Sequence, residues 1–134
     1  MINIPVLETE RLILRAPRED DLDREMDFYS SDHSKFVGGQ TSKMGAWDKI
    51  VGRVGHWAVR GYGFWHLDVL ETGQYVGRCG LLKPFGWPER EIGWSLMPDA
   101  LGHGYATEAA FAARDFAYNT LGWDTAIRLI APAN

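Results

Sequence analysis

The sequence has one cysteine, no basic stripe and no long apolar run. The lone thiol of Cys79 excludes an internal disulfide framework and is typical of a reducing cytoplasm, where we expect the protein to reside. Because no stretch of about 18 apolar residues occurs, we predict no membrane-spanning helix. The segment 1–5 has neither the basic nor the apolar region of a secretory signal peptide, so we expect none.

The sequence also lacks an excess of positive charge. It has 14 Lys and Arg against 18 Asp and Glu, which gives a net charge of −4. A nucleic-acid-binding domain shows a basic face or stripe, so we predict no nucleic-acid partner. An acidic surface instead tolerates, or mildly attracts, a cationic partner such as an amine.

What is present is the composition of one globular domain. The 134 residues are 46% hydrophobic and 24% charged, which suits one core and is too little for two, so we treat 1–134 as a single domain. The periodicities and turn residues predict an α+β order of elements. The predicted elements are strands at 10–16, 64–70, 74–82, 91–97 and 125–131, helices at 20–29 and 47–60, a loop at 30–41, and a glycine-rich loop at 102–107 that opens a helix.

Apolar periodicity defines the second predicted helix. Between residues 47 and 58 the apolar side chains recur at intervals of three and four, which predicts a stripe on one helix face. Gly61 is the predicted end of this helix. The stripe consists of Trp47, Ile50, Val51, Val54, Trp57 and Ala58.

The stretch that indicates chemistry is a glycine-rich loop between a strand and a helix. It reads Gly102-His103-Gly104-Tyr105-Ala106-Thr107 and follows the strand that ends at Pro98. The first turn of a helix has unpaired N–H groups and the positive end of the helix dipole, and glycines let a phosphate approach the backbone. The loop therefore favours a phosphate or pyrophosphate, although two glycines before a helix also occur in plain turns.

Two other phosphate-binding motifs fit less well. A dinucleotide-binding loop follows the first strand of a βαβ unit and has a third glycine, whereas this loop follows three antiparallel-looking strands. The Gly-Lys-Ser/Thr of a nucleotide-binding P-loop is absent.

Five segments along the chain form a recognisable series. They are Leu7-Glu8-Thr9-Glu10-Arg11-Leu12-Ile13-Leu14-Arg15, Gly63-Phe64-Trp65, Val76-Gly77-Arg78-Cys79-Gly80-Leu81, Glu91-Ile92-Gly93-Trp94 and Gly104-Tyr105-Ala106-Thr107-Glu108-Ala109. In their order and spacing, over nearly the whole chain, they resemble the GNAT acetyltransferase superfamily, in particular its RimJ/RimL-like branch. The resemblance implies a GNAT-like mixed, twisted sheet with helices on both faces.

The resemblance also implies acetyl-CoA as the co-substrate. Backbone amides of Gly102, His103, Gly104, Tyr105, Ala106 and Thr107 would bind the pyrophosphate, and the backbone of Leu96 and Met97 would pair with the pantetheine arm. The family's loop often begins with Gln or Arg, where this chain has Leu101, so one side-chain contact is lost.

Acetyl transfer to an amine requires removal of a proton from the nucleophile. Glu91 is our candidate general base, because alternation along its strand places it on one face with Gly93 and Ser95, and Ser95 could order a water. The alternatives are a Glu91 carboxylate paired with Arg90 or Arg78, and a serine hydroxyl satisfied within the sheet.

Two histidines, His66 and His103, each have two possible roles. His66 is either a base on the hairpin or a packed side chain, and His103 either contacts a phosphate or is simply exposed. The histidines are scattered, so we predict no metal site. We name no general acid.

The predicted function is acetyl transfer from acetyl-CoA to a primary amine, either a protein N-terminus or a small molecule, by direct attack in a ternary complex. Trp57, Trp65 and Trp87 are candidate walls of the acceptor site. The alternatives are a non-catalytic CoA-binding or regulatory module and a structural fragment that binds nothing; a homodimer stays open.

In the resembled family a further helix and two strands follow the point where this chain stops. We therefore expect residues 125–131 to form a strand with an unpaired edge and an exposed apolar face at Ile127, Leu129 and Ile130. These 134 residues alone are expected to self-associate and to be weak or inactive as an enzyme, unless a longer chain or a partner supplies the cover.

Overall fold

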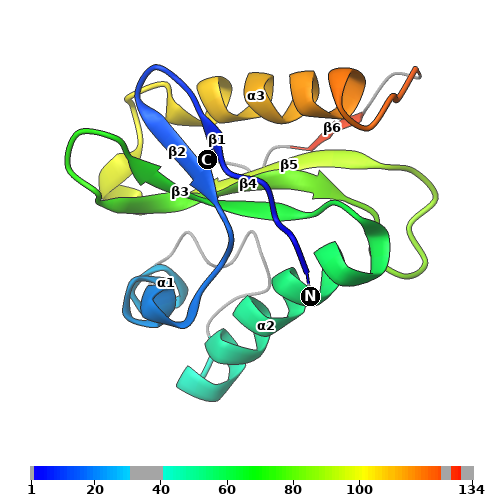
Figure 1. Ribbon diagram of the computed structural model, residues 1–134. Coiled ribbons are helices and arrows are strands. Elements are labelled where there is room, and N and C mark those ends of the chain that lie inside the picture. The colour runs from blue at the N-terminus through cyan, green and yellow to red at the C-terminus, as the bar shows by residue number, and fades with distance from the viewer. Residues whose placement is uncertain (1, 31–40, 125–127, 131–134) are drawn as a thin grey trace.

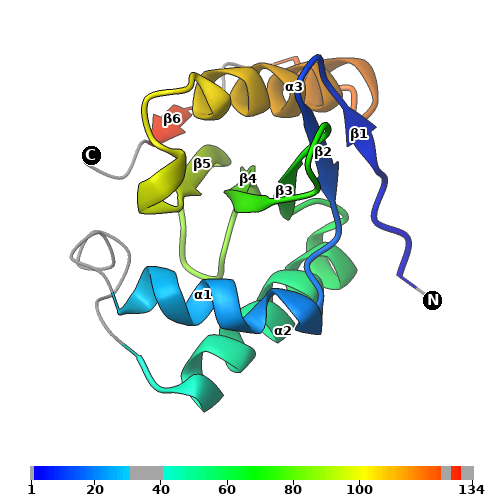
Figure 2. The same cartoon turned by 90° about the vertical axis from the view of Figure 1, so that its left-hand side faces the viewer.

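A six-stranded sheet with helices on both faces forms the framework of the protein. The computed structural model describes residues 2–30, 41–124 and 128–130, with side chains described as far as 124. Helix α3 lies on one face of the sheet, and α1 and α2 lie on the other (Figures 1 and 2). The predicted α+β class and the helices on both faces are confirmed.

The sheet follows the chain in simple order, β1-β2-β3-β4-β5-β6. The four pairings from β1 to β5 are antiparallel, and β6 pairs with β5 in parallel after the crossover through α3. The strands are β1 (Leu7–Glu8), β2 (Leu12–Arg15), β3 (Phe64–Val69), β4 (Tyr75–Leu82), β5 (Glu91–Leu96) and β6 (Arg128–Ile130). The helices are η1 (Glu19–Asp21), α1 (Leu22–Tyr29), α2 (Lys43–Arg60), η3 (Pro98–Ala100) and α3 (Tyr105–Asn119).

The local signals in the sequence locate most of these elements. The predicted hairpin is β3 and β4, with Gly73 in the left-handed conformation at its turn (φ 77°). Ser42 caps the start of α2 by accepting a hydrogen bond from the Gly45 amide (3.0 Å), and Gly61 ends it at φ 82°. The predicted loop at 30–41 falls almost entirely on residues 31–40, outside the described residues, as do the side chains of Ile127, Leu129 and Ile130.

The predicted apolar stripe on α2 is partly wrong. Trp47 and Val51 are 40% and 47% exposed, whereas the row that faces the sheet is Ala46, Ile50, Arg53 and Trp57. The pattern failed because the buried row includes an arginine, which hydropathy assigns to the surface. A carboxylate contributed by α1 makes this burial possible, as the site description explains below.

Two of the tryptophans belong to the core. Trp57 and Trp65 lie edge to face with ring centroids 5.0 Å apart, and Trp65 meets Phe116 of α3 at 5.2 Å. Alanines on the inner face of α3 bring that helix close to the sheet, since they have no long side chain to hold it off; they are Ala109, Ala113 and Ala117. We had expected Trp57 and Trp65 to line an acceptor site, but both side chains are packed in the core instead.

Candidate functional site

The glycine loop has the backbone shape that an anion site needs. Gly102 and Gly104 are in the left-handed region (φ 86° and 80°), which side-chain-bearing residues rarely adopt. Gly104 is the N-cap of α3, no side chain caps the helix, and the first helical bond runs from the Glu108 amide to the Gly104 carbonyl (3.2 Å). The amides of Tyr105–Thr107 thus have no acceptor within the helix and point toward its open end.

A salt-bridge clamp from the N-terminal segment braces this loop. The Arg11 guanidinium donates to the His103 carbonyl through Nη1 (2.7 Å) and to Glu108 Oε1 through Nε (2.7 Å). The Arg11 amide also donates to Glu108 Oε2 (2.8 Å), which Thr9 Oγ1 contacts as well. These bonds fix the loop and the start of α3 to the segment between β1 and β2.

The position of Arg11 adds positive charge beside the loop. Its Cζ lies 4.8 Å from the centroid of the Tyr105 ring, and its Nη2 would lie 3.3 Å from a Cβ on Gly104. Arg11 was not among the predicted site residues, although it stands in the opening segment that carries the family resemblance. Its partner Glu108 is 97 residues away, so no local pattern points to the pair.

The side chain of His103 is exposed and stacks on Tyr105. Their ring centroids are 5.2 Å apart at an interplanar angle of 17°. This geometry is compatible with the exposed alternative for His103.

Leu96 and Met97 differ in what their backbone can offer. The Met97 amide donates to the Val76 carbonyl (2.9 Å), and the Met97 carbonyl accepts from the Ala100 amide (2.9 Å). Because backbone groups alternate along an antiparallel strand, those of the neighbouring Leu96 point away from β4, toward the side where β6 lies. Leu96 is therefore the better placed of the two for pairing with an extended ligand.

The catalytic candidates lie on β5, beside a cavity. Glu91 is 4% exposed and lies opposite Leu82 of β4, while Ser95 is 7% exposed and lies opposite Arg78. Ser95 lines the cavity, and Glu91, although on the same face of β5, is not among its lining residues. The catalytic roles of both residues stay predictions.

The cavity has a volume of about 650 Å³ and lies between α1, α2 and the sheet. Its walls are mostly apolar or aromatic, with cationic side chains along one side. The lining residues are Tyr29, Lys49, Gly52, Arg53, His56, Phe64, Arg78, Leu82, Pro84, Trp87, Gly93, Trp94 and Ser95. Of the three tryptophans proposed as acceptor walls, only Trp87 lies here.

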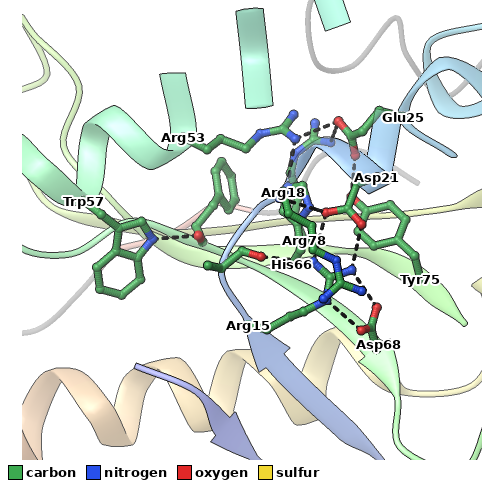
Figure 3. Close-up of polar contacts among 12 residues, drawn as sticks. Arg15, Arg18, Asp21, Glu25, Arg53, Trp57, His66, Asp68, Tyr75 and Arg78 are labelled. Carbon is green, nitrogen blue, oxygen red and sulfur yellow. Dashed lines mark hydrogen bonds and ion pairs between the residues drawn. The ribbon is translucent and has the colours of Figure 1, made fainter. Parts of the chain in front are cut away.

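A buried polar network borders the cavity (Figure 3). Glu25 of α1 accepts a hydrogen bond from Arg53 (2.7 Å) and one from the Tyr75 hydroxyl, and its Oε1 is 3.5 Å from Arg78 Nη1. Both arginines also donate to the Tyr29 hydroxyl, at 3.1 and 3.3 Å. This carboxylate explains why an arginine is tolerated on the inner face of α2.

The other half of the network is centred on Arg15. Its guanidinium makes paired bonds to Asp21 (2.7 and 2.9 Å) and to Asp68 (2.6 and 2.9 Å). Burial lowers the pKa of the guanidinium, but the hydrogen bonds that it donates to these carboxylates outweigh burial, and the pKa rises. No local pattern predicts this arrangement, because its members lie on three separate elements, β2, η1 and β3.

His66 connects the two halves and is held neutral. It is fully buried, with Nδ1 2.6 Å from Asp21 and Nε2 3.1 Å from Arg53 Nη1. Since the guanidinium can only donate, Nε2 must accept, and Nδ1 carries the proton toward Asp21. Burial lowers its pKa further, so the structure favours the packed alternative for His66 over a general base.

Within the described residues, no group of three or more His, Cys, Asp and Glu side chains is placed to hold a metal ion. None of the helices in that part of the chain combines the length and apolar character needed to span a bilayer.

The chain is similar to known proteins in sequence and in fold. The family model of the acetyltransferase (GNAT) domain matches residues 11–134. A crystal structure of an acetyltransferase from Agrobacterium tumefaciens str. C58 is 37% identical, with a TM-score of 0.82 over 92% of this chain and 72% of that one. An uncharacterized Bacillus subtilis protein, YkkB, is 33% identical over 79 residues, which are 56% of this chain and 46% of YkkB.

A more distant relative shares the fold. RimL, a ribosomal L7/L12 alpha-N-protein acetyltransferase solved in complex with coenzyme A, is 15% identical, with a TM-score of 0.62 over 86% of this chain and 70% of RimL. The family match covers far more than half of the sequence and includes the glycine loop and its Arg11 clamp. The chain therefore belongs to the GNAT acetyltransferase family.

Proposed function

We propose that this protein transfers the acetyl group of acetyl-CoA to a primary amine, by direct attack of the amine in a ternary complex. The observation that carries the proposal is the braced loop at 102–107, with its left-handed glycines and the uncapped amides at the start of α3. Acetyl-CoA supplies the activated acetyl thioester.

The residues present fit this co-substrate. The amides of Gly102 to Thr107 would hold the pyrophosphate, and a side chain in place of Gly104 would meet Arg11 there. The outward-facing backbone of Leu96 would pair with the pantetheine arm, while Met97 contributes its buried side chain to the core. RimL, which shares the fold, was solved with coenzyme A.

The cavity between α1, α2 and β5 is the proposed acceptor site. Gly93 and Ser95 of β5 line this cavity. An amine bound there could therefore reach the strand along which the pantetheine arm would lie. Glu91, two residues before Gly93 on the same face, would accept the amine proton through water, with Ser95 ordering that water. A protein N-terminus and a small amine are both acceptors consistent with the family.

A non-catalytic CoA-binding module is the second candidate. The burial of Glu91 outside the cavity lining favours it, since a base must reach its substrate directly or through one water. On the single cysteine we also propose a cytoplasmic location.

Two experiments separate these candidates. Acetyl-CoA should raise the melting temperature of the protein if either candidate is right, since a ligand that binds only the folded state stabilises it. Release of free CoA thiol in the presence of an amine panel is expected only of the enzyme. Binding without thiol release from any amine would leave the non-catalytic module.

A further inference from the structure

The walls of the acceptor cavity carry positive charge in excess. Three cationic side chains line it, Lys49, Arg53 and Arg78, and its described lining includes no Asp or Glu. Glu25 lies behind the wall and is shared by Arg53 and Arg78, so two positive charges are matched by one negative charge there. The nearby carboxylates Asp21 and Asp68 are both bound to Arg15.

Lys49 adds to the excess of positive charge at the cavity wall. Its Nζ lies 5.3 Å from the centroid of the Tyr29 ring, at the same wall of the cavity. Among the described residues, no carboxylate forms a salt bridge with it. An ammonium group that is partly removed from water, in a cavity that two guanidinium groups also line, favours an anion as its partner.

The Tyr29 hydroxyl provides a matching donor. Its oxygen accepts from Arg53 Nη2 and Arg78 Nη2, and the side chain is only 2% exposed. Because both contacts use the oxygen as the acceptor, the hydroxyl hydrogen is left to be donated. A carboxylate in the cavity would accept this hydrogen and a charged bond from Lys49.

His56 does not alter the charge of the cavity. Its Nδ1 lies 2.7 Å from the Tyr62 carbonyl, so this nitrogen carries the proton, and its Nε2 accepts from the Lys83 amide (3.1 Å). Both ring nitrogens are thus engaged by the backbone, and the ring is neutral. The cation excess of the lining therefore depends on Lys49 and the two arginines.

The rest of the lining fits an apolar body. Phe64, Leu82, Pro84, Trp87 and Trp94 form flat or branched walls around the cationic side. We infer that the acceptor is a free α-amino acid with an apolar or aromatic side chain, whose carboxylate binds at Lys49 and Tyr29. The inference rests on the proposed function, since it names the substrate class of the same cavity.

This charge pattern distinguishes the amino acid from the other acceptors the family allows. A polyamine would bring positive charge to a positive wall, which is unfavourable. A protein N-terminus has a neutral amide where the amino acid has its carboxylate, so it would gain no ion pair. An amine without a carboxylate would leave the cationic side unmatched.

The test compares acceptors that differ only in this group. We expect kcat/KM for phenylalanine to exceed that for phenylalaninamide by about tenfold or more, as the loss of a charge-assisted bond predicts, and spermidine to be the poorest acceptor. In Lys49→Met the KM for phenylalanine should rise while that for phenylalaninamide stays unchanged. Lys43→Met, an exposed lysine on the same helix outside the cavity, should change neither.

A binding measurement separates failure of this inference from failure of the proposed function. Calorimetry should show that N-acetylphenylalanine binds more tightly than N-acetylphenylalaninamide, and that Lys49→Met removes the difference. If thiol is released equally well with the acid and the amide, the inference is overturned while acetyl transfer stands. If no amine releases thiol, acetyl transfer fails, and equal binding of the two N-acetyl compounds would overturn the inference as well.

Discussion

Glu25 is the residue on which the charge balance beneath the cavity depends. Burial raises the pKa of this carboxyl group, but Arg53 and Arg78 lower it more strongly, to about 2. A carboxylate whose pKa is lowered by folding contributes stability above its usual pKa, and this contribution is lost as the pH falls through the folded value. The protein should therefore lose stability between pH 4.5, the ordinary value for this group, and about 2.

The variant Glu25→Gln should be destabilised at neutral pH by about 3–5 kcal/mol, because it leaves two buried guanidinium groups without their carboxylate. It should also show a smaller loss of stability on acidification than the wild type. Urea unfolding at several pH values measures both effects. Asp27→Asn on the same helix, where the carboxylate is exposed, is the matched control and should change little. A Glu25→Gln protein as stable as wild type would contradict this account of the network.

Glu91 is the proposed general base, and its substitution tests this role. Glu91→Gln should lower the acetylation rate at neutral pH by roughly 10²-fold or more, with little effect on acetyl-CoA affinity. Glu89→Gln, an exposed neighbour, serves as the control. If Glu91→Gln keeps both its rate and its pH profile, the base is another group or bulk water.

At the scale of elements, the junction of β5, η3 and α3 is the proposed cofactor site. Gly104→Val should weaken acetyl-CoA binding more than tenfold, or about 1.4 kcal/mol, because a branched side chain would occupy the place of the pyrophosphate. Gly73→Val is the matched control, since Gly73 is also left-handed (φ 77°) but lies in the hairpin turn. Calorimetry on both folded variants makes the comparison. Unchanged acetyl-CoA affinity in Gly104→Val would show that this loop is not part of the cofactor site.

The clamp between the N-terminal segment and α3 is the second feature at this scale. Arg11→Gln removes the bond to the His103 carbonyl and the ion pair with Glu108, which loosens the loop and leaves an acidic group near the pyrophosphate. We expect acetyl-CoA affinity to fall about tenfold, as for a lost charged hydrogen bond. Arg60→Gln at the exposed end of α2 is the control. If Arg11→Gln binds acetyl-CoA as tightly as the wild type does, the contacts of Arg11 are not needed to hold the loop in its binding conformation.

At the scale of the whole molecule, the sequence predicts those turns, helix ends and loops that depend on residues close together in the chain. The hairpin turn at Gly73, the end of α2 at Gly61 and the glycine-rich turn before α3 each have a local signal of glycine position or apolar spacing, and the structure confirms them. The loop predicted at 102–107 is shorter than expected, because α3 already begins at Tyr105. The family resemblance supplied the overall fold, which periodicity alone does not specify.

The remaining features depend on contacts between distant segments. Arg11 and Glu108 are 97 residues apart, and Glu25 and Arg53 are 28 apart, so neither pair produces a periodic pattern. The burial of Arg53 even runs against its hydropathy. The assignment of Trp57 and Trp65 to the core rather than to the acceptor site likewise depends on how α2 and α3 pack around β3.

Release of free thiol from acetyl-CoA shows whether this fold performs acetyl transfer. The purified protein is incubated with acetyl-CoA and a panel of amines, and free CoA is followed over time while mass spectrometry identifies the acetylated amine. The account predicts amine-dependent thiol release with a matching N-acetyl product, abolished or strongly reduced in Gly104→Val. Tight binding of acetyl-CoA with no amine-dependent release from any member of the panel would contradict it.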